Sequence, residues 1–410
     1  MNQGGAETMD ATHVLGQTGL IGSLRLPNRL IRSGTSESMG APTGMVDGRF
    51  EALHADLARG GVGLQFTGHL FVEGRGRYDP VQGGIHTDET VGPLQNATQA
   101  VHRAGGRIFA QLGHAGSQSV IPDVQPLSPS DVANVMHGRL VKAASGSEIE
   151  KTLACYHEAA RRAARADFDG IHIHAANGYL ISQFRSPLTN MRDDEWGGDA
   201  ERRERFPIEV IRAVRAALPS NMPITMKVGV RDITGHPQAL TREQSVAGIK
   251  KLIAAGLDGI EVSSNLMSDY VSGSIRSYVA VDRKRAFADL LYHRLLYAHG
   301  EDEAYFLEDA KALRPHTELP IILVGGLRRA DTMARIIESG VADFISMARP
   351  FIRQPDFARR ILSGQQQIAD CVSCNICLKY DGKDGLRCWR TPRSRLLQHA
   401  ARRVAAAFRR

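Results

Sequence analysis

The stretch "DGIHIHAANGYLISQF" (residues 169–184) begins as a buried β-strand and bends at Gly178. The strand part is apolar on both faces, which is typical of a parallel sheet covered by helices on each side. A single unit of this kind does not decide a fold. The fold class depends on how often the same strand-then-helix unit recurs along the chain.

Seven further segments match this strand pattern, and amphipathic helical patterns such as 148–167, 201–219 and 242–256 lie between most of them. Eight units with no break in composition predict a closed (β/α)8 TIM barrel, an α/β fold, over residues 14–364. A short four-cysteine segment (365–388) and a basic tail (389–410) would follow it. The eight expected strands are 29–36, 62–69, 107–114, 169–175, 223–230, 257–264, 320–326 and 342–348.

Composition and charge exclude several classes of protein. The net charge of +7 is carried by the tail, which holds seven arginines and no acidic residue, so residues 1–388 are close to neutral. A folded basic face for nucleic acid is therefore not expected. We find no signal peptide and no run of 18 apolar residues, and the five cysteines do not form a secreted disulfide pattern. These features predict a cytoplasmic protein that acts on a small molecule.

The turn after the fourth strand gathers three hydrogen-bonding side chains, His174, Asn177 and Tyr179. In an extended strand His174 and Asn177 would face opposite ways, so the chain must bend at 176–178, where Gly178 permits it. Imidazole and carboxamide can both donate to one oxygen atom, and a phenol can supply a proton. The group suits an oxygen that gains negative charge beside a proton donor.

Other expected strand ends carry binding groups. Lys227 lies in the fifth strand, Gly325 and Gly326 follow the seventh, and Arg349 follows the eighth. Barrels bind phosphate after their last two strands, which predicts a phosphate site there. We find neither a Rossmann fingerprint nor a Walker loop, so the barrel's own loops would hold any nucleotide cofactor.

The segment "HAANGYLISQFRSPLTNMRDDEWGGDAERRERF" (174–206) resembles the signature of the Old Yellow Enzyme family of FMN-dependent NAD(P)H oxidoreductases. The resemblance extends to 27–37, 60–69, 110–116 and 344–356. It implies that His174 and Asn177 hold a substrate carbonyl oxygen and that Tyr179 protonates the α-carbon. The FMN contacts that the resemblance implies are Gly34, Thr35, Ser36, Gly68, Gln111, Lys227, Gly325, Gly326, Ala348 and Arg349.

Some positions differ from the residues that are usual in the family, and some histidines are expected to be structural rather than catalytic. Ser36 replaces a usual Thr or Cys, Ser33-Gly34 stands where many relatives have a proline, and Ala348 replaces a frequent Gly. We expect His172 to fill a layer of the barrel core and His114 to be structural. For His69, contact with flavin or substrate stays open.

Four cysteines follow the barrel in a C-x2-C-x2-C-x10-C pattern: Cys371, Cys374, Cys377 and Cys388. This spacing indicates capacity for a metal or cluster. It resembles the [4Fe-4S] segment of multidomain relatives such as trimethylamine dehydrogenase and 2,4-dienoyl-CoA reductase. A [4Fe-4S] cluster, a zinc ion and an empty set of thiols are the three alternatives. Only 22 residues follow Cys388, so we expect any electron-transfer partner to be a separate protein.

The preferred function is an ene-reductase: NAD(P)H reduces FMN and leaves, and an electron-poor alkene then enters the same pocket. Two alternatives remain. One is an amine or N-methyl dehydrogenase that passes electrons through an Fe-S cluster to an external acceptor, and the other is a non-catalytic redox or interaction module. The sequence does not decide between NADH and NADPH or between a monomer and a homo-oligomer.

Overall fold

The chain forms a closed barrel of eight parallel strands in the computed structural model, which describes residues 10–122, 124–132, 134, 138–267, 303–371, 373–379, 384–390, 394 and 401. Each barrel strand pairs in parallel with two neighbours, and the last pairs with the first. The (β/α)8 prediction is confirmed. The strands are β3 (Leu30–Arg32), β4 (Leu64–Phe66), β6 (Ile108–Gly113), β9 (Gly170–Ala175), β10 (Ile224–Gly229), β11 (Gly259–Ser263), β12 (Ile321–Leu323) and β13 (Phe344–Met347).

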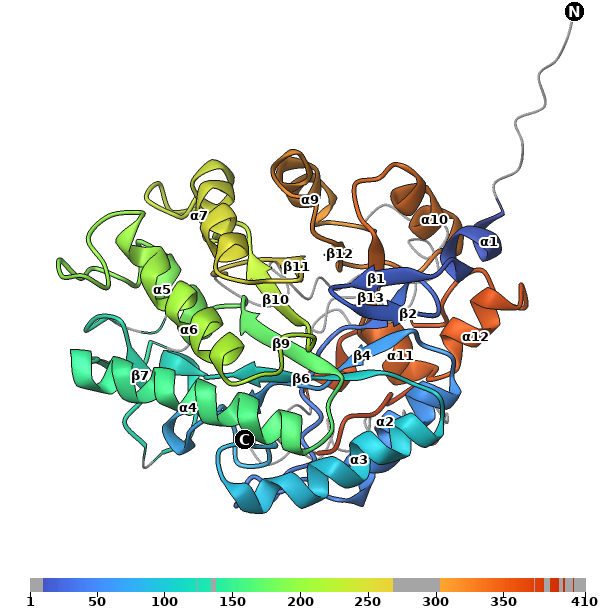
Figure 1. Ribbon diagram of the computed structural model, residues 1–410, viewed down its shortest axis with the longest axis horizontal. Helices are drawn as coiled ribbons and strands as arrows, with labels where there is room; N and C mark the ends of the chain where they lie inside the picture. The colour runs from blue at the N-terminus through green and yellow to red at the C-terminus, as the bar shows by residue number, and fades with distance from the viewer. Residues whose placement is uncertain are drawn as a thin grey trace, which may run out of the picture.

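Helices surround the strands, as Figure 1 shows. The three helices quoted as examples are present, and two begin with a capping box, Ser145 with Glu148 and Thr241 with Gln244, which satisfies free N–H groups of the first turn. The outer helices are α2 (Gly48–Arg59), α3 (Val91–Arg103), α4 (Gly146–Arg165), α6 (Arg205–Ala216), α7 (Arg242–Ala254), α9 (Leu307–Leu313), α10 (Ala330–Glu338), α11 (Arg349–Arg353) and α12 (Phe357–Leu362).

An N-terminal hairpin contributes to the core inside the barrel. It follows α1 (Ala11–Gly16) and consists of β1 (Gly19–Ile21) and β2 (Leu24–Leu26), paired antiparallel. Ile21 and Leu26 pack in one fully buried cluster with apolar side chains of the strands, including Phe66, Phe109 and Phe344. These residues fill the barrel interior next to the hairpin, so space for a ligand lies at the opposite end.

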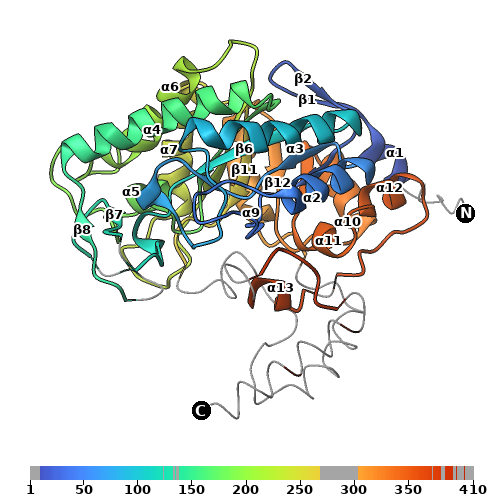
Figure 2. The ribbon, with the colours of Figure 1, turned by 90° about the horizontal axis from the view of Figure 1, so that it is seen from below.

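Long loops follow β6 and β11 at that opposite end of the barrel. The insertion at 115–146 includes η3 (Gly116–Gln118) and a small sheet of β7 (Leu127–Ser128) and β8 (Lys142–Ala143), whereas most of the insertion at 265–300 lies outside the described residues. The cysteine segment contains α13 (Ile376–Lys379) and is tied back by Leu386 N–H, which donates to the Glu37 carbonyl at 2.8 Å. Figure 2 shows α13 close to α11. The basic tail lies largely outside the described residues.

Candidate active site

A large cavity lies at the carboxyl ends of the barrel strands. It encloses about 1200 Å³ of space free of protein atoms, part of it open to solvent. Every strand or the loop directly after it contributes to the lining, as is usual for barrel active sites. The predicted site residues that line it are Gly34, Thr35, Ser36, Gln111, His174, Asn177, Tyr179, Lys227, Gly325, Gly326, Ala348 and Arg349.

Gly68 is the one predicted cofactor contact that the structure does not bring to this cavity. Its N–H donates to the Glu37 carboxylate at 2.7 Å, and a Cβ atom at this position would lie 2.2 Å from Glu37 Oε2. Glu37 also pairs with the buried Arg32 at 3.0 Å. Gly68 therefore lets two strand ends approach each other beneath the cavity.

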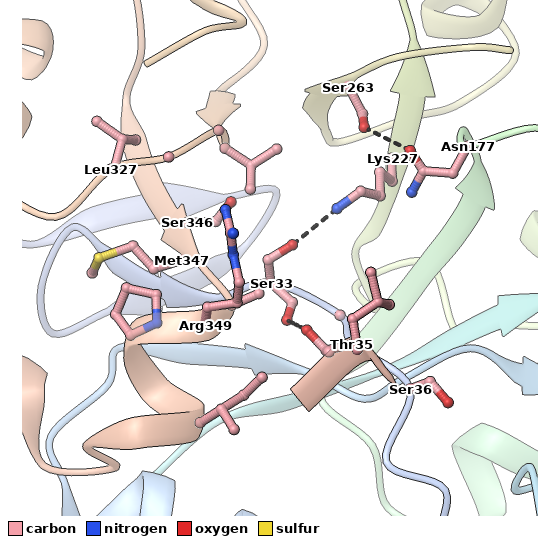
Figure 3. A pocket seen from close by; sticks show the side chains of 18 of the residues that line it. Ser33, Thr35, Ser36, Asn177, Lys227, Ser263, Leu327, Ser346, Met347 and Arg349 are labelled. Carbon is pink, nitrogen blue, oxygen red and sulfur yellow. Dashed lines mark hydrogen bonds between the residues drawn. The ribbon is translucent and has the colours of Figure 1, made fainter. Parts of the chain in front are cut away.

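The turn after β9 bends as predicted and orients Asn177. Asn177 and Gly178 have φ values of 61° and 76°, a left-handed conformation that asparagine and glycine tolerate best. Asn177 Oδ1 accepts hydrogen bonds from Ser263 at 3.2 Å and Ser264 at 3.4 Å (Figure 3 shows the first). The carbonyl end of the amide is thus occupied, and the NH2 end is available as a donor to a ligand.

Three rings form the part of the cavity next to Asn177. The ring centroids lie 4.7 Å apart for His174 and Tyr179, 4.8 Å for His69 and Tyr179, and 5.7 Å for His69 and His174. Burial, with His69 and Lys227 adding to it, holds the pKa of His174 well below its usual value, so its imidazole is neutral. His174 Nδ1 is buried and has no hydrogen-bond partner among the described residues.

Lys227 belongs to a buried charge network that crosses the barrel interior. Its Nζ donates to Glu261 at 2.8 Å and to Ser33 at 2.9 Å, and Figure 3 shows the bond to Ser33. Glu261 is fully buried and also contacts His172 at 3.2 Å and Ser346 at 2.6 Å. Burial alone would raise the pKa of Glu261, but Lys227 and His172 outweigh it, and the pKa is lowered.

Two histidines that the sequence analysis expected to be structural are buried. His172 is fully buried, stacks on Phe66 at 3.8 Å and lies outside the cavity lining, as the core interpretation predicted. His114 is likewise buried and contacts Glu73 at 2.9 Å. Sequence reasoning did not single out Glu261. The available signal was a lone acidic residue inside an apolar strand, "GIEVS" (259–263).

Gln111 presents an unpaired amide to the cavity. Its Nε2 is buried and has no partner among the described residues, and the same is true of Ser36 Oγ. A Cβ atom on Gly34 would lie 2.5 Å from Gln111 Nε2, so only glycine leaves the amide in place. An amide with donor and acceptor side by side fits the pyrimidine edge of an isoalloxazine. Buried polar groups without hydrogen-bond partners in the protein indicate that a ligand provides those partners.

The loops after β12 and β13 supply the features expected of a phosphate site. Gly325 and Gly326 have φ values of 125° and 75°, which few other residues adopt. Arg349 lines the cavity and donates to Asn375 Oδ1 at 2.6 Å. Two backbone glycines and a guanidinium at one end of the cavity fit a phosphate group.

All four cysteines of the C-terminal segment line a second, smaller cavity with about 340 Å³ of space free of atoms. Cys377 and Arg349 line both cavities, so the two adjoin. Burial and the other cysteines raise the pKa of Cys377 to about 12. Within the described residues, however, no three potential metal ligands lie close enough to form a coordination set.

The described part of the chain contains no helix long and apolar enough to cross a membrane.

Comparison with known proteins identifies the relatives of this barrel. The family profile described as NADH:flavin oxidoreductase / NADH oxidase family matches residues 20–367. The NADH oxidase of Thermoanaerobacter brockii is 30% identical over 363 residues, which cover 87% of this chain and 52% of the relative. The 4,4'-dithiodibutanoate disulfide reductase of Rhodococcus erythropolis is 31% identical over 370 residues, covering 87% of this chain and 90% of the relative.

A solved structure matches over a similar span. The Old Yellow Enzyme homologue from Zymomonas mobilis superposes with a TM-score of 0.69 at 25% identity, covering 90% of this chain and 98% of that one. The chain thus spans nine tenths or more of the length of some relatives, such as the disulfide reductase, and about half the length of others, such as the NADH oxidase.

Proposed function

Because the chain belongs to the NADH:flavin oxidoreductase / NADH oxidase family, we propose that it uses NAD(P)H and FMN to reduce electron-poor alkenes such as α,β-unsaturated carbonyl compounds. The family makes the chain a flavin-dependent oxidoreductase with FMN as cofactor and NAD(P)H as reductant. One observation supports the alkene: His174, Asn177 and Tyr179 face the same cavity as the groups that suit FMN.

FMN fits the residues of the large cavity. Gln111 would hold the pyrimidine edge of its ring, and Lys227 would lie near N1 and O2, where negative charge collects on reduction. Gly325, Gly326 and Arg349 would hold the phosphate. The remaining predicted contacts are the backbone and hydroxyl groups of Gly34, Thr35, Ser36 and Ala348, with Gly68 acting behind them.

His174 and Asn177 would bind the carbonyl oxygen of the substrate. Asn177 is oriented for this role because two serines occupy its Oδ1 and leave its NH2 as the donor. His174 is neutral, so one ring nitrogen carries a hydrogen and can donate. Two donors on one carbonyl oxygen stabilise the negative charge that develops there during reduction.

Tyr179 would supply the proton. The chemistry that bound FMN would supply is transfer of a hydride, taken from NAD(P)H, to the β-carbon of the alkene. The α-carbon would then take a proton from the buried Tyr179, whose ring centroid lies 4.7 Å from that of His174. A phenol stays protonated at neutral pH but is acidic enough to protonate an enolate carbon.

The test replaces Tyr179 by phenylalanine. Loss of a general acid slows its step by about 10²–10⁴-fold. We therefore expect Tyr179→Phe to slow reoxidation of the reduced enzyme by 2-cyclohexenone to that extent, while reduction by NADH or NADPH changes little. Anaerobic stopped-flow absorbance measures the two half-reactions separately. An equal fall in both rates would contradict the role of Tyr179.

The four-cysteine cavity favours a second candidate function. In it, an amine or N-methyl substrate is oxidised and electrons leave through an Fe-S cluster to a separate acceptor protein. The supporting observation is that Cys377 lines both the four-cysteine cavity and the main one. Iron and acid-labile sulfide in anaerobically purified protein, with a brown colour, would support this function. Stoichiometric FMN without iron would favour the reductase.

A further inference from the structure

His69 lies at the mouth of the barrel and contacts Tyr179 directly. It follows β4 and lines the main cavity, and its Nε2 is 3.3 Å from the Tyr179 hydroxyl oxygen. The two rings come from segments 110 residues apart in the sequence. The role of this contact depends on which nitrogen of His69 carries the hydrogen.

Gln82 determines that tautomer. The Tyr78 N–H donates to Gln82 Oε1 at 2.5 Å, and because a backbone N–H can only donate, the oxygen of the amide must be on that side. Gln82 Nε2 therefore faces His69, where it donates to the carbonyl oxygen at 2.7 Å and to Nδ1 at 2.6 Å. Nδ1 accepts this bond and so carries no hydrogen.

His69 is also neutral. Burial lowers its pKa to about 4, although Glu37 opposes the shift. A neutral imidazole carries one hydrogen, and since Nδ1 is an acceptor, that hydrogen is on Nε2. His69 thus donates to the Tyr179 oxygen, and this bond does not use the proton of the phenol itself.

We propose that Gln82 and His69 are positioning residues that make Tyr179 a better proton donor. This inference rests on the proposed function. In the protonation step the Tyr179 O–H bond breaks, the electron pair of the enolate forms the new bond between the α-carbon and hydrogen, and negative charge stays on the phenol oxygen. His69 Nε2–H donates to that oxygen, and the bond strengthens as the charge develops because bonds to ionised acceptors are stronger than neutral ones. Solvent water later returns a proton to the phenolate.

The test compares two amide substitutions that differ by one methylene. In His69→Gln the amide nitrogen can occupy the position of Nε2 and donate to Tyr179. In His69→Asn the amide reaches only the position of Nδ1, next to Gln82. One charge-assisted hydrogen bond corresponds to about 10- to 100-fold in rate. We expect His69→Asn to slow reoxidation by 2-cyclohexenone by about that factor and His69→Gln to stay within about threefold of the unmodified enzyme.

A double substitution shows whether His69 acts through Tyr179. In the Tyr179→Phe background the acceptor oxygen is missing, so adding His69→Asn should change the rate of reoxidation by less than about threefold. The absorbance spectrum of bound FMN and the rate of reduction by NADH serve as controls for an intact site. Equal losses in His69→Asn and His69→Gln, or a full loss in the double variant, would overturn the proposal. If Tyr179→Phe alone has no effect on reoxidation, the proposed function itself fails.

Discussion

The ion pair between Lys227 and Glu261 makes a strong prediction about stability. Nζ and Oε2 lie 2.8 Å apart, Glu261 is fully buried, and Lys227 is 5% exposed. Lys227→Met would leave the Glu261 carboxylate buried without its cation. Removing one partner of a buried pair costs about 3–5 kcal/mol. We expect the free energy of unfolding to fall by an amount near the lower end of this range, about 3 kcal/mol, because His172 and Ser346 still contact Glu261.

The pH dependence of this loss has a definite sign. In the unmodified protein the pKa of Glu261 is lower in the folded state than in the unfolded state. Ionised Glu261 therefore contributes its full stability at pH values above the pKa of the unfolded state. Without Lys227, we expect burial to outweigh the contact with His172 and to raise the pKa of Glu261 in the folded state above the unfolded value. Ionisation then opposes folding, and the loss in Lys227→Met should grow as the pH rises from 5 to 8.

Urea denaturation measures the loss. Far-UV circular dichroism and the fluorescence of Trp196 and Trp389 should give coincident curves if unfolding has one transition. Because bound FMN also stabilises the folded state, each variant is measured at several FMN concentrations. Lys311→Met is the matched control, since the pair of Lys311 with Glu308 is exposed and screened by solvent, so its removal should leave the urea midpoint nearly unchanged.

A second variant tests the cause. Lys227→Met combined with Glu261→Gln removes both charges, so it should recover at least half of the stability lost in Lys227→Met alone. A loss below about 1 kcal/mol in Lys227→Met, or a double variant as unstable as the sum of the single ones, would refute the buried-pair explanation.

Three further outcomes follow from single contacts. Gly34→Ala places a Cβ atom 2.5 Å from the Gln111 amide, so we expect FMN affinity to fall at least about tenfold in a fluorescence titration; unchanged affinity would contradict the assignment of Gln111. Burial raises the pKa of Glu73, but contacts led by His114 outweigh it and lower the pKa to about 2. The stability that ionised Glu73 contributes is therefore complete above its pKa in the unfolded state and is lost as the pH falls towards 2. Between pH 4.5 and 2.5 the melting temperature of Glu73→Gln should decrease less than that of the unmodified protein. Gly178→Ala forces a side chain into a left-handed position with a φ of 76°, so enone-driven reoxidation should slow more than reduction by NADH; equal slowing would indicate a general loss of structure.

The sequence by itself determined the fold and most of the candidate site. The eight strands are apolar on both faces, and that local pattern is enough to predict a parallel barrel. The barrel then brings the strand ends together, so residues as far apart as His174 and Arg349 were expected at one mouth, and both line the cavity. The turn at 177–178 was predictable because asparagine and glycine tolerate left-handed backbone.

Tertiary structure alone decided which partner each polar group takes. Lys227 meets Ser33 across 194 residues of sequence, and Tyr179 meets His69 across 110. Periodicity shows which face of a strand is buried, but it does not show which side chains from different strands share a layer of a closed barrel. That choice depends on strand register and loop conformation, and these placed Gly68 beneath the cavity and Cys377 at its edge.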